Sequence, residues 1–142
     1  MISSEPQGAR PEVTKKDRVL MIDDEPPMLA MYQAALSSSF EITTAANASE
    51  ATRLLEQRAF KVVVADHLMP GETGMDFLVR MRKEFPRMQR VILSGYLKAD
   101  LLLRSVTEAD VFRSLSKPVP MRELVRVIQE AARAHDVAVA AK

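Results

Sequence analysis

The sequence contains no cysteine and no tryptophan, and it has only four glycines among its 142 residues. The absence of cysteine excludes disulfide bonds and thiolate metal sites. The glycines, at positions 8, 71, 74 and 95, form no G-x-G-x-x-G pattern of the kind that binds dinucleotides. No apolar run is long enough for a signal peptide or a membrane span. The net charge of +1 is too balanced to indicate direct nucleic-acid binding. We therefore expect a cytoplasmic protein without direct nucleic-acid or membrane contacts.

The length of the chain fits one domain, and its 47% hydrophobic residues are enough to build a core. The prolines, serines and mixed charges of residues 1–17 predict a flexible N-terminal tail. The domain is expected at 18–135, followed by a short C-terminal tail at 136–142. The initiating methionine favours a stand-alone protein, and a domain cut from a longer protein is the other interpretation.

Charge is distributed unevenly along the domain. Residues 18–79 hold 4 basic and 9 acidic side chains, whereas residues 80–142 hold 13 basic and 7 acidic ones. One end or face should therefore be acidic and another basic. An acidic pocket attracts a cation, and a basic surface suits an acidic partner.

Short apolar runs recur along the chain and predict strands. The runs at 19–22, 62–65 and 91–93 lack polar alternation, which is typical of parallel strands covered on both faces. Two weaker runs, at 40–45 and 111–115, fit outer strands.

Helical patterns separate these strands. A helix begins near Pro26 and Pro27, and capping boxes are predicted at Asn47 with Glu50 and at Thr73 with Asp76. Apolar stripes with helical spacing are Met28, Met31, Ala35 and Leu36; Ala51, Leu54 and Leu55; Ala99, Leu102, Leu103 and Val106; and Leu124, Val127, Ile128 and Ala131. The alternation predicts an α/β fold, (βα)5, with a five-stranded parallel doubly wound sheet in the flavodoxin-like order 2-1-3-4-5.

The polar residues that directly follow the strands should meet at one edge of this sheet, because ligands of such folds bind beyond the carboxyl ends of the strands. Asp23 and Asp24 follow the first strand, Asp66 the third, Ser94 the fourth and Lys117 the fifth. Three converging carboxylates repel one another, and a hard cation such as Mg²⁺ would relieve the repulsion while leaving coordination sites for phosphate oxygens. One carboxylate could then attack a phosphoryl group, and Lys117 and Ser94 could hold its oxygens.

Each residue also has a plainer interpretation. The first two aspartates could cap a helix, Asp66 could be a turn residue before Pro70, and Lys117 and Ser94 could be an ordinary surface lysine and an ordinary strand end. His67 is not interpreted as a metal or phosphorelay residue, because no second histidine lies near it in the sequence.

Two other phosphate-handling classes fit the residues less well. A phosphatase of the haloacid-dehalogenase type requires a second aspartate two positions after the first, where this chain has Leu68. A flavin or dinucleotide binder requires a glycine-rich or hydroxyl-rich loop after the first strand, where this chain has two aspartates, a glutamate and two prolines.

Four segments together resemble the response-regulator receiver domain of two-component signalling. They are residues 19–26 (VLMIDDEP), 62–71 (VVVADHLMPG), 91–96 (VILSGY) and 115–118 (LSKP), in the family's order and spacing. The resemblance extends over nearly all of the expected domain. The first and third segments look most like receivers of cyclic-di-GMP phosphodiesterase (HD-GYP) regulators.

This resemblance implies a set of roles at the acidic edge. Asp66 would be the phosphoacceptor and, with Asp24, a direct Mg²⁺ ligand. Asp23 would assist in metal binding, and the backbone carbonyl of Leu68 would be a further ligand. The phosphoryl group would come from a sensor histidine kinase or phosphotransfer protein, and the chain would catalyse only its own phosphorylation and dephosphorylation.

The resemblance also implies how the phosphoryl group is sensed. Ser94 would respond to it, Lys117 would pair with it, and the bond from Lys117 to Pro118 would be cis. The family's switch aromatic is replaced by Ser114, so we expect the signal to leave through Tyr96 or the fourth helix.

Two further expectations concern the output. Mixed charges on the last helices and strand suit a phosphorylation-dependent homodimer through that surface or a selective partner, and a solvated charged face explains them equally well. The alternative function is a receiver-fold interaction module that acts without phosphorylation.

Overall fold

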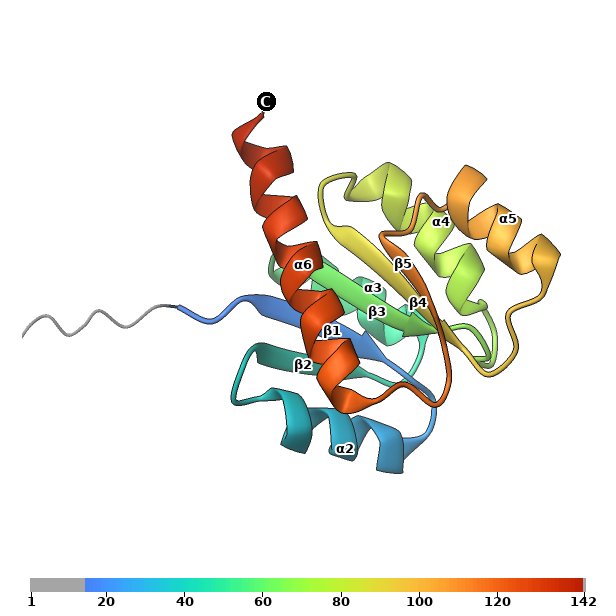
Figure 1. Cartoon of the computed structure of the whole chain (residues 1–142), viewed down its shortest axis with the longest axis horizontal. Coiled ribbons are helices and arrows are strands. Elements are labelled where there is room, and N and C mark those ends of the chain that lie inside the picture. The colour runs from blue at the N-terminus through green and yellow to red at the C-terminus, as the bar shows by residue number, and fades with distance from the viewer. Residues whose placement is uncertain (1–14, 142) are drawn as a thin grey trace, which may run out of the picture.

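The computed structural model describes residues 15–141 and contains five strands that alternate with five helices (Figure 1). The strands are β1 (Arg18–Ile22), β2 (Glu41–Ala45), β3 (Val62–Asp66), β4 (Gln89–Ser94) and β5 (Arg113–Ser116). The helices are α2 (Pro26–Leu36), α3 (Ala48–Gln57), α4 (Gly74–Glu84), α5 (Ala99–Thr107) and α6 (Met121–Ala140).

The five strands form one parallel sheet in the order β2-β1-β3-β4-β5, which confirms the predicted fold. In the register of the sheet, Ile22 pairs with Ala65, and Ser94 pairs with Ser116. The strands therefore end at a common edge, and the strand order reverses between β1 and β3. This is the position at which doubly wound folds bind their ligands.

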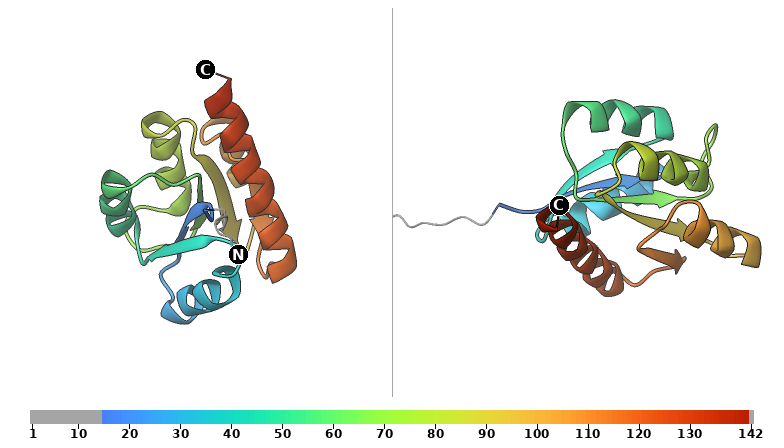
Figure 2. Two further views of the ribbon diagram at one scale, coloured as in Figure 1. Left: turned by 90° about the vertical axis from the view of Figure 1, so that its left-hand side faces the viewer. Right: turned by 90° about the horizontal axis from the view of Figure 1, so that it is seen from above.

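Helices cover both faces of the sheet, with α3, α4 and α5 on one side and α2 and α6 on the other (Figure 2). Alternate residues of one strand enter different cores: Leu20 of β1 packs on the α3–α4 side, and its neighbours Val19 and Met21 pack on the α2–α6 side. Because both faces are covered, β1 and β3 need uninterrupted apolar sequence.

Asn47 and Thr73 are the N-cap residues of α3 and α4, as predicted, but the return bond of a capping box to the N-cap N–H is not formed in either pair. Asn47 Oδ1 accepts a hydrogen bond from the Glu50 N–H at 2.8 Å, and Glu50 Oε1 accepts one from the Ala46 N–H at 2.8 Å. Thr73 Oγ1 accepts a hydrogen bond from the Asp76 N–H at 3.1 Å. These contacts satisfy amide groups that a helix start leaves without partners.

The predicted buried stripe of α5 was wrong. Ala99, Leu102, Leu103 and Val106 all face solvent, and the exposed fractions of Leu103 and Val106 are 64% and 68%. The buried residue of α5 is Ser105, and the partly buried Leu101 packs against the core. The small Ser105 lets α5 lie close to the sheet, which a larger side chain at that position would prevent.

The predicted stripe of α2 was also shifted. Met31 is 42% exposed and Ala35 is exposed, whereas Tyr32 and Leu36 are buried. Tyr32 reads as polar in the sequence, yet its large ring fills the space between α2 and the sheet.

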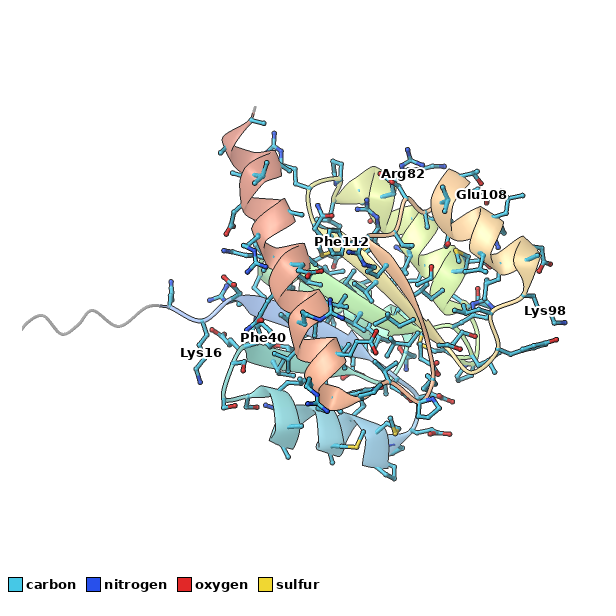
Figure 3. The ribbon with its side chains drawn as sticks, in the orientation of Figure 1. Lys16, Phe40, Arg82, Lys98, Glu108 and Phe112 are labelled. Carbon is cyan, nitrogen blue, oxygen red and sulfur yellow. The ribbon has the colours of Figure 1, made fainter. Side chains whose placement is uncertain are left out.

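The last strand starts two residues later than predicted, at Arg113. Val111, predicted to lie in this strand, instead donates its N–H to the Ser105 carbonyl of α5 at 2.9 Å. Just before it, the buried Arg90 guanidinium donates hydrogen bonds to the carbonyls of Ala109 (2.8 Å) and Asp110 (3.0 Å), and also to that of Met88 (2.6 Å). Asp110 has a φ of +47°. This contact fixes the turn between α5 and β5. Arg82 of α4 makes a second contact with this region, because its guanidinium donates to the carbonyls of Thr107 and Glu108 at the end of α5 (Figure 3).

The predicted C-terminal tail at 136–142 is corrected by the structure, because α6 continues as a helix to Ala140. Asp136 is held to the domain by Lys61 Nζ at 2.8 Å. Residues 1–14 of the predicted N-terminal tail lie outside the described residues, whereas Asp17 contacts the domain through the same lysine at 2.8 Å. In the part of the chain that the structure describes, no helix is long and apolar enough to cross a membrane.

Candidate functional site

Three carboxylates lie together where β1 and β3 end. Asp23 and Asp24 directly follow β1, and Asp66 is the last residue of β3, its neighbour in the sheet. One carboxylate oxygen from each residue lies within 4.8 Å of the others. The convergence predicted from the strand order is therefore present.

Asp23 shows that this cluster suits a cation. Its side chain is fully buried, and its Oδ1 accepts a hydrogen bond from the Glu25 N–H at 2.9 Å. Its Oδ2 is buried without a hydrogen-bond partner among the described residues. Buried carboxylate oxygens are costly without a partner, and a set of two or three carboxylates that keeps space for water fits Mg²⁺.

Lys117 supplies the positive charge at the site. Its Nζ lies 3.2 Å from Asp66 Oδ1 and 3.5 Å from Asp23 Oδ2. Its backbone N–H donates to the Ser94 carbonyl at 2.8 Å, which ties it to the end of β4. The peptide bond from Lys117 to Pro118 is cis, as predicted.

Burial and charge act in opposite directions on these groups. Burial raises the pKa of Asp66, Lys117 lowers it, and the nearby Asp23 and Asp24 raise it further, so the net direction is upward. Burial lowers the pKa of Lys117, but Asp66 and Asp23 outweigh it and raise the pKa overall. Lys117 is therefore a cation at neutral pH, and one ammonium group does not fully compensate the cluster.

The Ser94 side chain is 2% exposed and is bonded to the loop that follows β4. Its hydroxyl donates to the Tyr96 carbonyl and accepts from the Tyr96 N–H, both at 3.1 Å. The hydroxyl thus couples the end of β4 to the start of the loop that leads into α5.

Gly74 allows the first turn of α4 to approach the end of β3. A Cβ atom at this position would lie 2.2 Å from the backbone oxygen of Asp66, and the Gly74 N–H donates to the His67 carbonyl at 2.9 Å. Only glycine fits such a backbone contact. The loop between them thereby holds Asp66 in place.

Two large side chains, Leu68 and Tyr96, lie in the loops that follow β3 and β4. Leu68 is 70% exposed and Tyr96 is 72% exposed. They line a cavity of about 430 Å³ together with His67, Ser94, Lys98, Asp100, Leu101 and Arg104. Lys98 Nζ lies 5.5 Å from the centre of the Tyr96 ring and points outward at this end of the molecule (Figure 3).

Sequence reasoning missed Tyr32 as a neighbour of the site. Its ring is buried, and burial together with the charge of Asp23 raises its pKa to about 12. It also lines a small cavity with Lys117 and Pro118. Tyr32 is four residues before Leu36, so the helical spacing of the sequence could have predicted that both lie on the inner face of α2.

His67, which directly follows β3, has a buried ring nitrogen and a backbone contact with β4. Its Nδ1 is buried without a hydrogen-bond partner in the described part of the chain. Its backbone N–H donates to the Leu93 carbonyl at 2.8 Å, which continues the β3–β4 ladder past Asp66.

Comparison with known proteins gives a consistent assignment. The family described as the response regulator receiver domain matches residues 19–129. The chain is 31% identical over 120 residues to the hydrogenase transcriptional regulatory protein HoxA of Cupriavidus necator, covering 84% of this chain and 25% of HoxA. It is 33% identical over 116 residues to the response regulator Rre1 of Synechocystis, covering 78% of this chain and 49% of Rre1. The chain thus spans about a quarter to a half of these relatives.

Solved structures agree with this result. The response regulator receiver domain protein from Clostridium thermocellum superposes with a TM-score of 0.80 at 30% identity, covering 86% of this chain and 98% of that one. The signal receiver domain of an HD domain-containing protein from Pseudomonas fluorescens superposes with a TM-score of 0.83 at 25% identity, covering 87% and 99%. The resemblance to HD-GYP receivers stays a prediction, because the similar proteins include both a transcriptional regulator and an HD domain-containing protein. The chain belongs to the response-regulator receiver family.

Proposed function

We propose that the protein accepts a phosphoryl group on Asp66 in a Mg²⁺-dependent reaction, from a sensor histidine kinase or a phosphotransfer protein. The observation that carries the proposal is the arrangement of Asp66, Asp23 and Lys117: one buried carboxylate oxygen has no hydrogen bond among the described residues, and a single ammonium group lies within 3.5 Å of both aspartates. We further propose that it acts in the cytoplasm without direct contact to nucleic acid or membrane.

In the proposed reaction a carboxylate oxygen of Asp66 attacks phosphorus, and the bond to the donor's nitrogen or oxygen breaks as the acyl phosphate forms. Lys117 would pair with a phosphoryl oxygen and so neutralise charge that the transfer brings into the pocket. Asp23, Asp24 and Asp66, with the Leu68 carbonyl, would hold Mg²⁺, which supplies further charge neutralisation when bound. The chain would catalyse only its own phosphorylation and dephosphorylation.

The Ser94 hydroxyl supports a route for the signal. A phosphoryl oxygen on Asp66 would compete for this hydroxyl, and its two hydrogen bonds to the Tyr96 backbone would then be lost. Ser114, at the family's aromatic position, is hydrogen-bonded to Ser105 of α5 at 3.0 Å. The readout would therefore run through Tyr96 and α5, and a Tyr96→Ala variant should lose phosphorylation-dependent binding or dimerisation.

The surface of α2 supports docking of the donor. None of its eleven residues is charged, and Ala30, Met31, Ala34 and Ala35 are exposed beside the acidic edge. An uncharged helical face of small residues suits close packing against helices of a phosphodonor.

The surface of α5 supports a phosphorylation-dependent homodimer. Leu102, Leu103 and Val106 form an exposed apolar ridge, which we call the α5 ridge. The nearby strand and last helix carry paired charges such as Arg113 and Glu130. An apolar ridge with a charged border is a typical interface composition.

The lifetime of the acyl phosphate should be long, because Leu68 and Tyr96 restrict the approach of water to Asp66. Leu68→Asn should shorten the half-life, as measured by the loss of phosphoryl mass after the donor is removed. The matched control is Leu103→Asn on the α5 ridge, which should leave the half-life unchanged. Rapid loss in the wild type that Leu68→Asn does not alter would contradict this assignment.

The function itself is tested by intact mass after incubation with acetyl phosphate, with and without Mg²⁺. One phosphoryl group is expected on the wild type with Mg²⁺, and none is expected on Asp66→Asn or without the metal. No addition under any condition would favour the interaction module that acts without phosphorylation.

A further inference from the structure

The edge of the sheet opposite the acidic site carries an apolar groove of about 500 Å³. It lies where β3 and β4 begin and α3 and α4 end, so it shares no lining residue with the acceptor site. The apolar lining is formed by Leu55, Ala59, Phe60, Phe85, Met88 and Val139. A volume of this size is within the range of small-molecule sites, roughly 300–1,000 Å³.

Two guanidinium groups border this apolar lining. Arg58 and Arg87 both line the groove and both are exposed. Neither has a carboxylate within ion-pair distance among residues 15–141, whereas the adjacent Lys61 is paired with both Asp17 and Asp136. Glu56 is the one acidic residue in the lining. The groove therefore combines apolar surface with two cations available to a ligand.

A second hollow of about 300 Å³ adjoins the first and shares Ala59, Phe60 and His135 with it. Lys15 and Lys16 lie on its border, and no acidic side chain is within ion-pair distance of either one in the described chain. Asp17 and Glu41 also line this hollow, but they are paired with Lys61 and Arg18. The charges left without an ion pair there are positive, and they complement a ligand with a negative head group.

We propose that this groove binds a small amphipathic anion, with one carboxylate or comparable head group and an aliphatic or aromatic body. The head group would pair with Arg58 and Arg87, whose planar donors match a carboxylate. The body would lie on the accessible part of the lining, formed by Ala59, Phe85 and Val139, and bury apolar surface there, whereas Phe60 and Met88 beneath it are already buried in the core.

The ligand would also contact the end of the last helix. His135 and Val139 belong to the final turns of α6, and Val139 is 40% exposed. A bound molecule would join these turns to α3 and to the loop before β4. Slower amide hydrogen exchange in residues 136–140 is therefore an expected consequence of binding.

The test uses the full 142-residue chain and the fluorescent anion 8-anilinonaphthalene-1-sulfonate, with amide chemical shifts to locate it. The double variant Arg58→Ala/Arg87→Ala should bind about tenfold more weakly or worse, as expected for the loss of charge-assisted contacts. The matched control Lys83→Ala/Arg133→Ala removes two exposed cations outside the groove and should bind like the wild type. Decanoate should displace the probe, whereas uncharged decanol should do so poorly.

Any one of three binding results would overturn the proposal, as would the absence of binding. The three results are equal affinity of the groove variant and its control, shift changes on the α5 ridge instead of the groove, and displacement by decanol as effective as that by decanoate. Absence of binding by both probes would also overturn it and would direct attention to a peptide partner. Asp66→Asn should bind the probe with wild-type affinity, so this site succeeds or fails independently of phosphorylation.

Discussion

The two edges of the sheet differ in how completely their charged side chains are compensated by hydrogen bonds and ion pairs. At the edge where the strands begin, the buried Arg90 guanidinium donates to three carbonyls, and the partly exposed Lys61 bridges two aspartates. At the edge where the strands end, the buried Asp23 has one oxygen without a hydrogen bond in the described part of the chain, and Asp23 and Asp66 share a single lysine. Satisfied charges hold the fold in place, whereas incompletely satisfied ones are available for chemistry.

The largest stability effect is expected at Arg90. Arg90→Met removes the donor of three buried carbonyl contacts, so we expect the free energy of unfolding to fall by about 3 kcal/mol or more. Chemical denaturation measures the loss. Arg113→Met, which changes an exposed arginine, is the control and should cost less than about 1 kcal/mol. A similar cost for both variants would contradict the structural role of Arg90.

An intermediate effect is expected at Gly74, where the fold meets the site. Gly74→Ala would place a Cβ 2.2 Å from the Asp66 backbone oxygen, so α4 must shift, with a loss of about 1–3 kcal/mol and a lower rate of phosphoryl incorporation. Gly95→Ala is the matched control, because no atom lies within 4 Å of its added Cβ. Thermal unfolding and mass incorporation of both variants check the expectation, and equal behaviour would refute it.

The smallest expected effect on stability is at Asp66, where a substitution should stabilise the protein instead of destabilising it. Its pKa is raised in the folded protein, so the stability that its protonated form contributes is lost as pH rises through that pKa. Asp66→Asn should therefore have the higher melting temperature at pH 7 without divalent cations, and the difference should shrink as pH falls through the carboxyl range. A lower melting temperature for Asp66→Asn at pH 7 would mean that Asp66 stabilises the fold.

The acidic edge could be predicted from sequence because each of its residues directly follows a strand. Once the runs at 19–22 and 62–65 are assigned as strands, Asp23 and Asp66 have to end at the same edge. The order of the sheet does not depend on fine packing, so these residues were located without knowledge of any side-chain contact.

The phase of α5 could not be predicted in the same way. Its sequence offers two candidate faces, and the more apolar one, with Leu103 and Val106, is exposed. Burial was decided by the close approach of Ser105 and by its hydrogen bond to Ser114, neither of which leaves an apolar signal. The contact of Arg90 with the turn before β5 could not be predicted either, because its acceptors are backbone carbonyls, which every residue type carries.

The extension of α6 was missed because its final turns lack a continuous apolar stripe. Asp136 and Val137 are exposed, and the contact of Asp136 with Lys61 joins residues far apart in the sequence. Ion pairs between distant segments cannot be derived from local pattern.

We propose that the edge with incompletely compensated carboxylates carries the phosphoacceptor, and reductive trapping identifies which aspartate it is. Borohydride reduction of an aspartyl phosphate, followed by peptide mass analysis, identifies the modified residue. After incubation with acetyl phosphate and Mg²⁺, we predict homoserine at position 66 and unmodified Asp23 and Asp24. Homoserine at position 23 or 24, or at none of the three positions, would show that Asp66 is not the phosphoacceptor.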